Sequence, residues 1–244
     1  MKQYIILFML IVFTRSHAQQ LTEISSGDFI REMRPVIEKM NQDNSKLRFK
    51  KEVYRDARSN ELLSSSVGVI YHGKERSFRM EDGGVTIMQT NDIYLVVDSL
   101  DRVIQLAEPD TNFNPSMALM NLKAEALEKF QLSSYKNATF ITYKVVPENL
   151  MDGTIEYQVD LKSNMIYRFK ISYPAANYFS EDLDDETVEE PYAVITYEPL
   201  EKIKDPQKLF DLKQYIVPDQ EGKYKLSDQL VNYELYDSRY HPIK

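Results

Sequence analysis

Short runs of alternating apolar and polar residues fill the sequence from residue 46 to residue 106 and constrain the fold more than any other feature. In the first run, Leu47, Phe49 and Val53 alternate with charged residues, the pattern of a strand that buries one face. Similar runs follow at residues 62–71, 77–80, 85–88, 93–97 and 102–106. Asp82-Gly83-Gly84 separates two of them, and glycine supplies the positive φ that tight hairpin loops require. We therefore expect a meander of about six antiparallel strands.

Two segments carry apolar residues at helical spacing instead. The first has a capping signal at Ser25, with Asp28 three residues later. Its apolar face consists of Phe29, Met33, Val36, Ile37 and Met40. Because Pro35 lies inside it, this helix either bends there or begins near Glu32. The second helix is expected to open at Asn114-Pro115. Its apolar face consists of Met117, Met120, Ala124, Leu127 and Phe130.

Further strands are expected after the second helix. The runs are residues 139–146, 155–160, 166–173 and 192–197, followed by a helical turn at 206–212 and a terminal hairpin or arm at 224–226 and 231–236. Seven of the ten residues at 181–190 are acidic, which is typical of a solvated loop. No internal repeat or linker divides the chain, so residues 19–244 are interpreted as one domain.

The N-terminus has the pattern of a secretory signal peptide. A cation at Lys2 precedes an apolar stretch from Tyr4 to Phe13, about half as long as a bilayer-spanning helix needs. Small residues at Ser16 and Ala18 predict cleavage after Ala18, which makes residues 1–18 the signal peptide. The alternative is an uncleaved N-terminal anchor. Cleavage predicts a periplasmic protein, and without any cysteine the mature chain offers no thiol for acylation.

Charge and composition exclude several classes of function. Residues 1–18 hold two cations and no acid, so cleavage changes the formal charge from −8 to −10, which disfavours a nucleic-acid partner. The absence of cysteine excludes thiol catalysis and cysteine-based metal sites. The two histidines beyond the signal peptide, His72 and His241, lie in no nucleophile or metal-ligand motif. The acidic segment lacks the spacing of an EF-hand. We expect no catalytic residues, no metal and no cofactor.

Three stretches resemble the LolA-like family of periplasmic outer-membrane lipoprotein carriers. Residues 68–80 are similar to the family's hairpin of glycine, aromatic, basic and phenylalanine positions, and residues 90–103 to the hairpin that follows it. Leu209-Phe210-Asp211-Leu212 is similar to a late phenylalanine element. The resemblance is densest over residues 46–106. It implies an α+β fold with a strongly curved antiparallel sheet, an unclosed β-barrel, whose covering helices enclose an apolar cavity.

The resemblance also implies a function and a binding site. The protein would be a carrier or chaperone that binds an acyl chain or a lipoprotein, acts as a monomer and contributes to outer-membrane biogenesis. The wall of the cavity would consist of Phe49, Val53, Val69, Tyr71, Phe78, Met80, Met88, Leu95, Val97, Ile104 and Leu106, and its lid of Met117, Met120 and Leu127. Lys74 falls nearest the family's hairpin arginine, which ties the lid to the barrel, although lysine lacks arginine's planar fork.

A different function is compatible with the same sequence. The fold would then have a packed core and serve as a non-catalytic envelope module, with the acidic segment 181–190 and the tail 219–244 docking onto a membrane-associated partner protein. Its aromatic contacts would be Tyr224, Tyr233, Tyr236 and Tyr240. A third alternative, a secreted hydrolase, is disfavoured by the scarcity of histidine and the absence of cysteine and tryptophan.

Overall fold

The computed structural model describes residues 21–56, 60–110, 127–148, 153–173, 190–220 and 223–240. Several predictions fall outside these residues: the signal peptide, the second helix with Met117 and Met120, the acidic segment up to residue 189, His241, and the side chain of Tyr240. Among the described residues, no helix is both long enough and apolar enough to span a bilayer.

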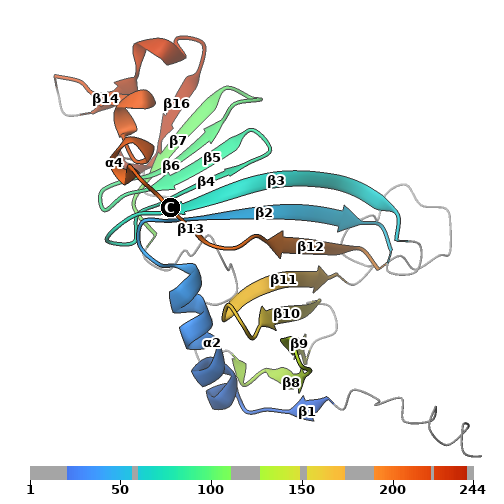
Figure 1. Cartoon of the computed structure of the whole chain (residues 1–244). Coiled ribbons are helices and arrows are strands. Elements are labelled where there is room, and N and C mark those ends of the chain that lie inside the picture. The colour runs from blue at the N-terminus through green and yellow to red at the C-terminus, as the bar shows by residue number, and fades with distance from the viewer. Residues whose placement is uncertain are drawn as a thin grey trace, which may run out of the picture.

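One large, strongly curved sheet of fourteen strands forms the frame of the protein (Figure 1). Its strands along the chain are β1 (Thr22–Glu23), β2 (Ser45–Tyr54), β3 (Leu62–His72), β4 (Phe78–Asp82), β5 (Val85–Gln89), β6 (Tyr94–Asp98), β7 (Val103–Ala107), β8 (Phe130–Lys136), β9 (Phe140–Pro147), β10 (Thr154–Asp160), β11 (Met165–Ser172), β12 (Tyr192–Tyr197), β13 (Glu201–Lys202) and β16 (Glu234–Asp237). In space the order is β1-β8-β9-β10-β11-β12-β2-β3-β4-β5-β6-β7-β16, with β13 beside β2. All pairs are antiparallel except β7–β16. Within the described residues the end strands β1 and β16 do not meet, so the sheet is unclosed, as predicted.

Helix α2 (Ser26–Met40) crosses one face of the sheet. β1, just before it, pairs with β8, and β2, just after it, pairs with β12 and β3. Five steps of about 4.8 Å separate β8 from β2, which is about 24 Å, and a helix of 15 residues is about 22 Å long. The helix therefore has the length needed to bridge these six strands.

The start of α2 confirms one prediction and decides an alternative. The Ser25 side chain accepts a hydrogen bond from the Asp28 backbone N–H at 3.1 Å, so Ser25 is the N-cap, as expected. The helix continues through Pro35, whose ring lies on the exposed side. A start near Glu32 is therefore wrong.

The predicted meander is confirmed as β2 to β7, but two later expectations are wrong. Phe130, expected on the second helix, is the first residue of β8. Of the expected terminal hairpin or arm, the hairpin does not form: β15 (Tyr224–Leu226) pairs with β14 (Ile216–Pro218), and β16 joins the large sheet beside β7. The C-terminal segment also contains α4 (Pro206–Leu209) and the 3-10 helices η3 (Leu212–Gln214), η4 (Asp228–Leu230) and η5 (Ser238–Tyr240).

The sheet buries different faces at its two ends. Leu47, Phe49 and Ile70 share the inner face, defined here as the face against which α2 packs. Residues paired across neighbouring strands point to the same face. The inner face therefore continues from Ile70 through Met80 and Ile87 to Val96 on β6. The fully buried residues of β5 to β7 lie between these positions in sequence and hence on the outer face: Met88, Leu95, Val97, Ile104 and Leu106.

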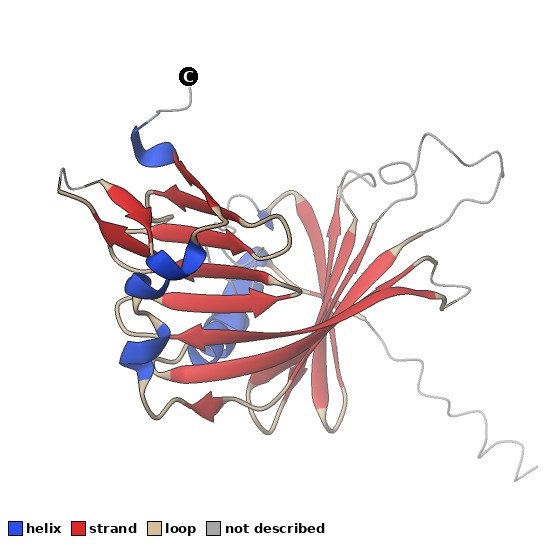
Figure 2. Ribbon diagram, turned by 90° about the horizontal axis from the view of Figure 1, so that it is seen from above, coloured by secondary structure: helices blue, strands red, loops and turns tan. Residues whose placement is uncertain are grey.

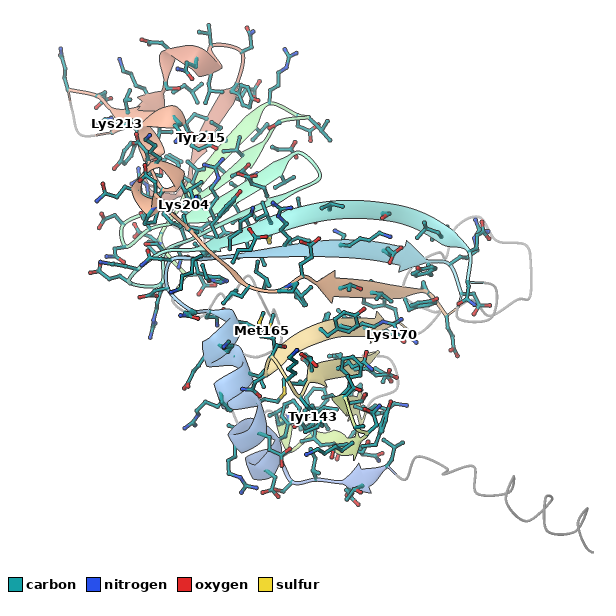
Figure 3. All side chains as sticks on the ribbon, viewed as in Figure 1. Tyr143, Met165, Lys170, Lys204, Lys213 and Tyr215 are labelled. Carbon is teal, nitrogen blue, oxygen red and sulfur yellow. The ribbon has the colours of Figure 1, made fainter. Side chains whose placement is uncertain are left out.

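The C-terminal segment covers this outer cluster, as α2 covers the inner one. Ile216 is buried within it, and Phe210, Tyr215, Leu226 and Leu235 pack around it. In Figure 2, α2 lies behind the strands and the C-terminal turns lie in front of them. Figure 3 shows the same division: Tyr143 and Met165 lie toward α2, whereas Lys213 and Tyr215 belong to the C-terminal segment.

Candidate binding cavity

A cavity of about 200 Å³ lies between α2 and the strands β9 and β10. Its lining consists of Phe29, Ile30, Met33, Arg34, Ile37, Glu38, Leu127, Val145, Ile155 and Tyr157. The six helical residues form one stripe with the spacing i, i+1, i+4, i+5, i+8 and i+9, and the three strand residues share the inner face. Eight of the ten side chains are apolar or aromatic, so the cavity suits a hydrocarbon better than a polar ligand.

Aromatic contacts and one hydrogen bond hold α2 above the strands. The ring of Phe29 packs edge-on against Tyr143, with centroids 5.5 Å apart, and lies 6.2 Å from the ring of Tyr157. The Tyr143 hydroxyl donates a hydrogen bond to Glu32 at 2.7 Å. Burial, together with this bond, raises the pKa of Tyr143, and burial raises the pKa of Tyr157. Both phenols therefore stay protonated, and the hydroxyl of Tyr143 remains a donor to Glu32, at neutral pH.

The charged members of the lining are Arg34 and Glu38, one helical turn apart on α2. Both side chains are exposed, in contrast to the buried Met33 on the same stripe. The cavity therefore has an apolar floor and an amphipathic edge with one positive and one negative group.

The structure does not bring the predicted wall residues onto one wall. Phe49 and Leu127 belong to the inner cluster, and Met80 packs against it. Val53 and Phe78 also lie on the inner face by register. Of all the predicted residues that the structure describes, Leu127 alone lines the cavity beneath α2.

The other seven predicted wall residues lie on the outer face. Val69 and Tyr71 border an open, polar groove together with Arg48, Arg79 and Glu81. Arg79 is already paired with Glu81 at 2.8 Å. The remaining five are the core of the outer cluster: Met88, Leu95, Val97, Ile104 and Leu106. A single cavity wall is excluded for this set because paired residues on neighbouring strands share a face, and the register assigns these residues to the opposite one.

The predicted aromatic contacts of the tail are divided as well. Tyr224 and Tyr233 pack against the outer cluster, and the guanidinium of Arg239 lies 4.7 Å from the ring centroid of Tyr224. Tyr236 is 55% exposed, which makes it the one of these three that is largely accessible to another protein.

The residues considered for chemistry lie apart from the cavity lining. His72 is buried at the end of β3, and burial lowers its pKa to about 4. Lys74 is exposed in the β3–β4 turn, where its carbonyl accepts a hydrogen bond from Ser77. Its role as a lid latch stays a prediction. The described residues contain no group of three or more histidine, aspartate or glutamate side chains that could hold a metal ion.

Sequence reasoning missed nine of the ten lining residues, although most of their patterns had been recognised. Phe29, Met33 and Ile37 belong to the predicted apolar face of the first helix, and Val145, Ile155 and Tyr157 lie in predicted strands. The sequence did not show that this helix lies against these strands. The pairing of β1 with β8 fixes the start of α2 at this end of the sheet, and the two-residue strand β1 has no recognisable sequence signal.

No family model matches the sequence, and no curated protein does. Solved structures are similar to it. A chain in the MucA/MucB complex of Pseudomonas aeruginosa has a TM-score of 0.42 and 11% identity, and the match covers 75% of this chain but only 60% of that one. LolA superfamily protein NE2245 from Nitrosomonas europaea has a TM-score of 0.36 and 11% identity over 77% of this chain and 97% of its own. A putative outer membrane lipoprotein-sorting protein domain from Vibrio parahaemolyticus has a TM-score of 0.33 and 12% identity, with 77% and 97% covered.

The LolA-like resemblance of the sequence recurs among these structures.

Proposed function

We propose that the protein is an exported, non-catalytic carrier or chaperone that binds an acyl chain in the cavity between α2 and strands β9 and β10. The observation that carries the proposal is the apolar lining of that cavity, to which the helix and the sheet both contribute. Export is proposed from the N-terminal sequence, with cleavage after Ala18 and a periplasmic location.

The size of the cavity limits what it can hold. Water occupies about 30 Å³ in the liquid, and a methylene group is of similar size, so about 200 Å³ accommodates roughly seven methylenes. At about 0.8 kcal/mol for each, their burial contributes on the order of 5 kcal/mol. This is comparable to the lower estimates of the cost of association. Binding through the cavity alone is therefore weak and reversible, as a carrier that must release its cargo requires.

The outer cluster is a poorer candidate for the same role. Leu95 and Ile104 are 0% exposed and already packed by the C-terminal segment, whereas Phe29 and Ile155, which line the cavity, are each 6% exposed. An acyl chain could enter the outer cluster only by displacing side chains of the protein itself, which makes entry beneath α2 far less costly.

A chain-length series tests the proposal. Saturated alcohols of increasing length, kept below their aggregation concentrations, are titrated against the purified protein by calorimetry or by displacement of a fluorescent acyl probe. We expect the affinity to rise about fourfold per methylene and to level off after roughly seven methylenes. No binding at any length, or a uniform rise without a plateau, would contradict the assignment to this cavity.

A filling variant with a matched control locates the site. Ile30 is half-buried on the cavity stripe of α2, whereas Lys39 is exposed on the same helix and outside the lining. Ile30→Trp should abolish binding because the indole occupies the cavity, and Lys39→Trp should leave binding unchanged. Binding that survives in both variants would place the ligand elsewhere.

The alternative, an envelope interaction module with a packed core, has one specific observation in its favour. β3 exposes three apolar side chains, Leu62 at 49%, Leu63 at 42% and Val67 at 70%, so a partner protein could cover apolar surface on this strand. Native mass spectrometry of protein released from the periplasm separates the two functions. Added mass that disappears on delipidation supports the carrier, and a clean mass with a stoichiometric protein partner supports the module.

A further inference from the structure

Two charged residues, Arg34 and Glu38, lie at the edge of the cavity with their side chains free to meet a ligand. Arg31 is paired with Asp28 at 2.6 Å, and Glu32 accepts a hydrogen bond from Tyr143. The side chains of Arg34 and Glu38 form no ion pair or hydrogen bond with any residue in the described part of the chain, and not with each other, although residues one turn apart commonly pair.

Their placement defines what a complementary head group must look like. An apolar tail beneath α2 leaves its polar end at the edge, next to one guanidinium and one carboxylate. Residues at this helical spacing are neighbours on one face, so their long side chains can reach the two opposite charges of one compact head group. A purely anionic head group would meet the repulsion of Glu38, and a purely cationic one the repulsion of Arg34.

We propose that the ligand of this site is a zwitterionic amphiphile with a single acyl chain and a phosphoethanolamine head group. The inference rests on the proposed acyl-chain function. The tail occupies the cavity, the phosphate accepts hydrogen bonds from the fork of Arg34, and the ammonium donates to Glu38. One chain is specified because about 200 Å³ is less than a single long chain requires and leaves no space for a second.

Three ligands with the same tail test the head-group assignment. They are a lysophosphatidylethanolamine, the corresponding fatty acid and the corresponding fatty alcohol, each measured by displacement of the same fluorescent probe. Exposed charge pairs contribute up to about 1 kcal/mol, so the zwitterion should bind up to about fivefold more tightly than the alcohol for each charge satisfied. The fatty acid should gain little over the alcohol, because attraction to Arg34 and repulsion by Glu38 oppose each other.

Charge-removing variants give each residue its own signature. Arg34→Gln should weaken the zwitterion about two- to fivefold and weaken the fatty acid. Glu38→Gln should weaken the zwitterion by a similar factor but tighten the fatty acid. Lys39→Gln, a charge removed from an exposed position outside the lining, should change neither. Since all three positions are exposed, the variants should unfold like the parent chain.

The outcomes distinguish failure of this inference from failure of the proposed function. Equal affinity for the three ligands, or equal effects of all three variants, would overturn the head-group assignment while leaving an acyl-chain site intact. Tighter binding of the fatty acid than of the zwitterion would overturn it as well. If even the alcohol failed to bind, the proposed function itself would be wrong.

Discussion

The two ends of the sheet bury their apolar residues in different ways. On the inner face, a helix of 15 residues lies across six strands, and a cavity of about 200 Å³ remains beneath it. On the outer face, side chains from the short helical turns and strands of the C-terminal segment pack over β5 to β7, and Leu95 and Ile104 are 0% exposed. A rigid rod crossing a twisted sheet touches it along a line, whereas an irregular segment can fill the hollows.

This difference suggests a division of labour. The outer region supplies stability through close packing, and the inner region sacrifices some packing for a space that a ligand can occupy. The following measurements, in order of decreasing effect on the free energy of unfolding, test this division.

Matched truncations in the two regions should have the largest effect. Ile104→Ala removes a fully buried side chain from the outer cluster and should lower the free energy of unfolding by about 4 kcal/mol. Ile155→Ala removes a side chain that already borders the cavity and should lower it by only about 2 kcal/mol. Denaturant unfolding measures both. Equal losses would show that the two regions are equally well packed.

Protonation of His72 should have the next largest effect. Folding lowers its pKa from 6.5 to about 4 through burial, so between these values the unfolded chain binds a proton that the folded chain does not. The free energy of unfolding should therefore fall as the pH drops from about 6.5 to about 4, by at most about 1.4 kcal/mol per pH unit and roughly 3 kcal/mol in total. His72→Gln should remove this part of the pH dependence, and identical profiles would contradict the assignment.

The position of His72 also allows a test of whether the two ends of the sheet unfold together. His72 on β3 pairs with Phe78 on β4, between the strands that α2 covers and the strands β5 to β7 that the C-terminal segment covers. Hydrogen exchange at pH 5 should show whether amides of α2 and of β6 lose protection together. Separate loss would mean that the two regions unfold independently.

Removal of the hydroxyl that holds α2 should have the smallest effect. Tyr143→Phe deletes the donor to Glu32 and should lower the free energy of unfolding by about 1 kcal/mol, with faster amide exchange in α2 than in β6. Tyr167→Phe is the matched control, because Tyr167 is 45% exposed and stacks on Phe140 through its ring. An equal loss of unfolding free energy in Tyr167→Phe would show that the Tyr143–Glu32 hydrogen bond has no particular role.

The elements of this fold could be predicted better than their relations. Alternation and turn residues were sufficient for β2 to β7, since each strand there pairs with its neighbour in sequence. The capping side chain of Ser25 indicated the correct start of α2, although Pro35 left a start near Glu32 open until the structure decided it. The parallel pairing of β16 with β7 and the place of Phe130 at the start of β8 depend on tertiary contacts, which no local pattern records.

The turn at Gly83-Gly84 is a sequence signal that the predicted wall residues lie on two faces. A two-residue turn at Gly83-Gly84, both with positive φ, pairs Asp82 with Val85. That register pairs Met80 with Ile87 and therefore places Met88 on the opposite face. Selecting apolar residues without this step merged two surfaces into one. The cavity itself could not be found this way, because it depends on how α2 lies on strands more than a hundred residues away.

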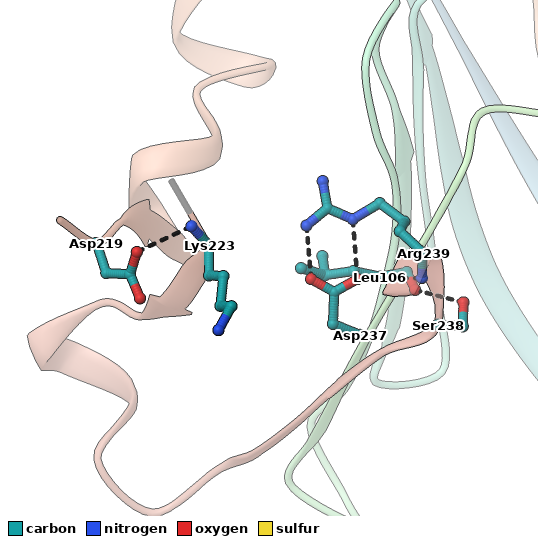
Figure 4. A network of polar contacts seen from close by, with 6 residues as sticks. All are labelled: Leu106, Asp219, Lys223, Asp237, Ser238 and Arg239. Carbon is teal, nitrogen blue, oxygen red and sulfur yellow. Dashed lines mark hydrogen bonds and ion pairs between the residues drawn. The ribbon is translucent and has the colours of Figure 1, made fainter. Parts of the chain in front are cut away.

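Strand β16 is the last strand at one edge of the sheet and covers the edge of β7. It lies parallel to β7, and beyond it the Ser238 hydroxyl donates to the carbonyl of Leu106 at 2.7 Å, while Arg239 and Asp237 pair beside it (Figure 4). These partners are 132 residues apart in sequence. Until β16 has paired with it, β7 has an open edge that can recruit a strand from a neighbouring molecule. The stage of folding before β16 docks is therefore the one in which the protein most needs shielding from its own copies.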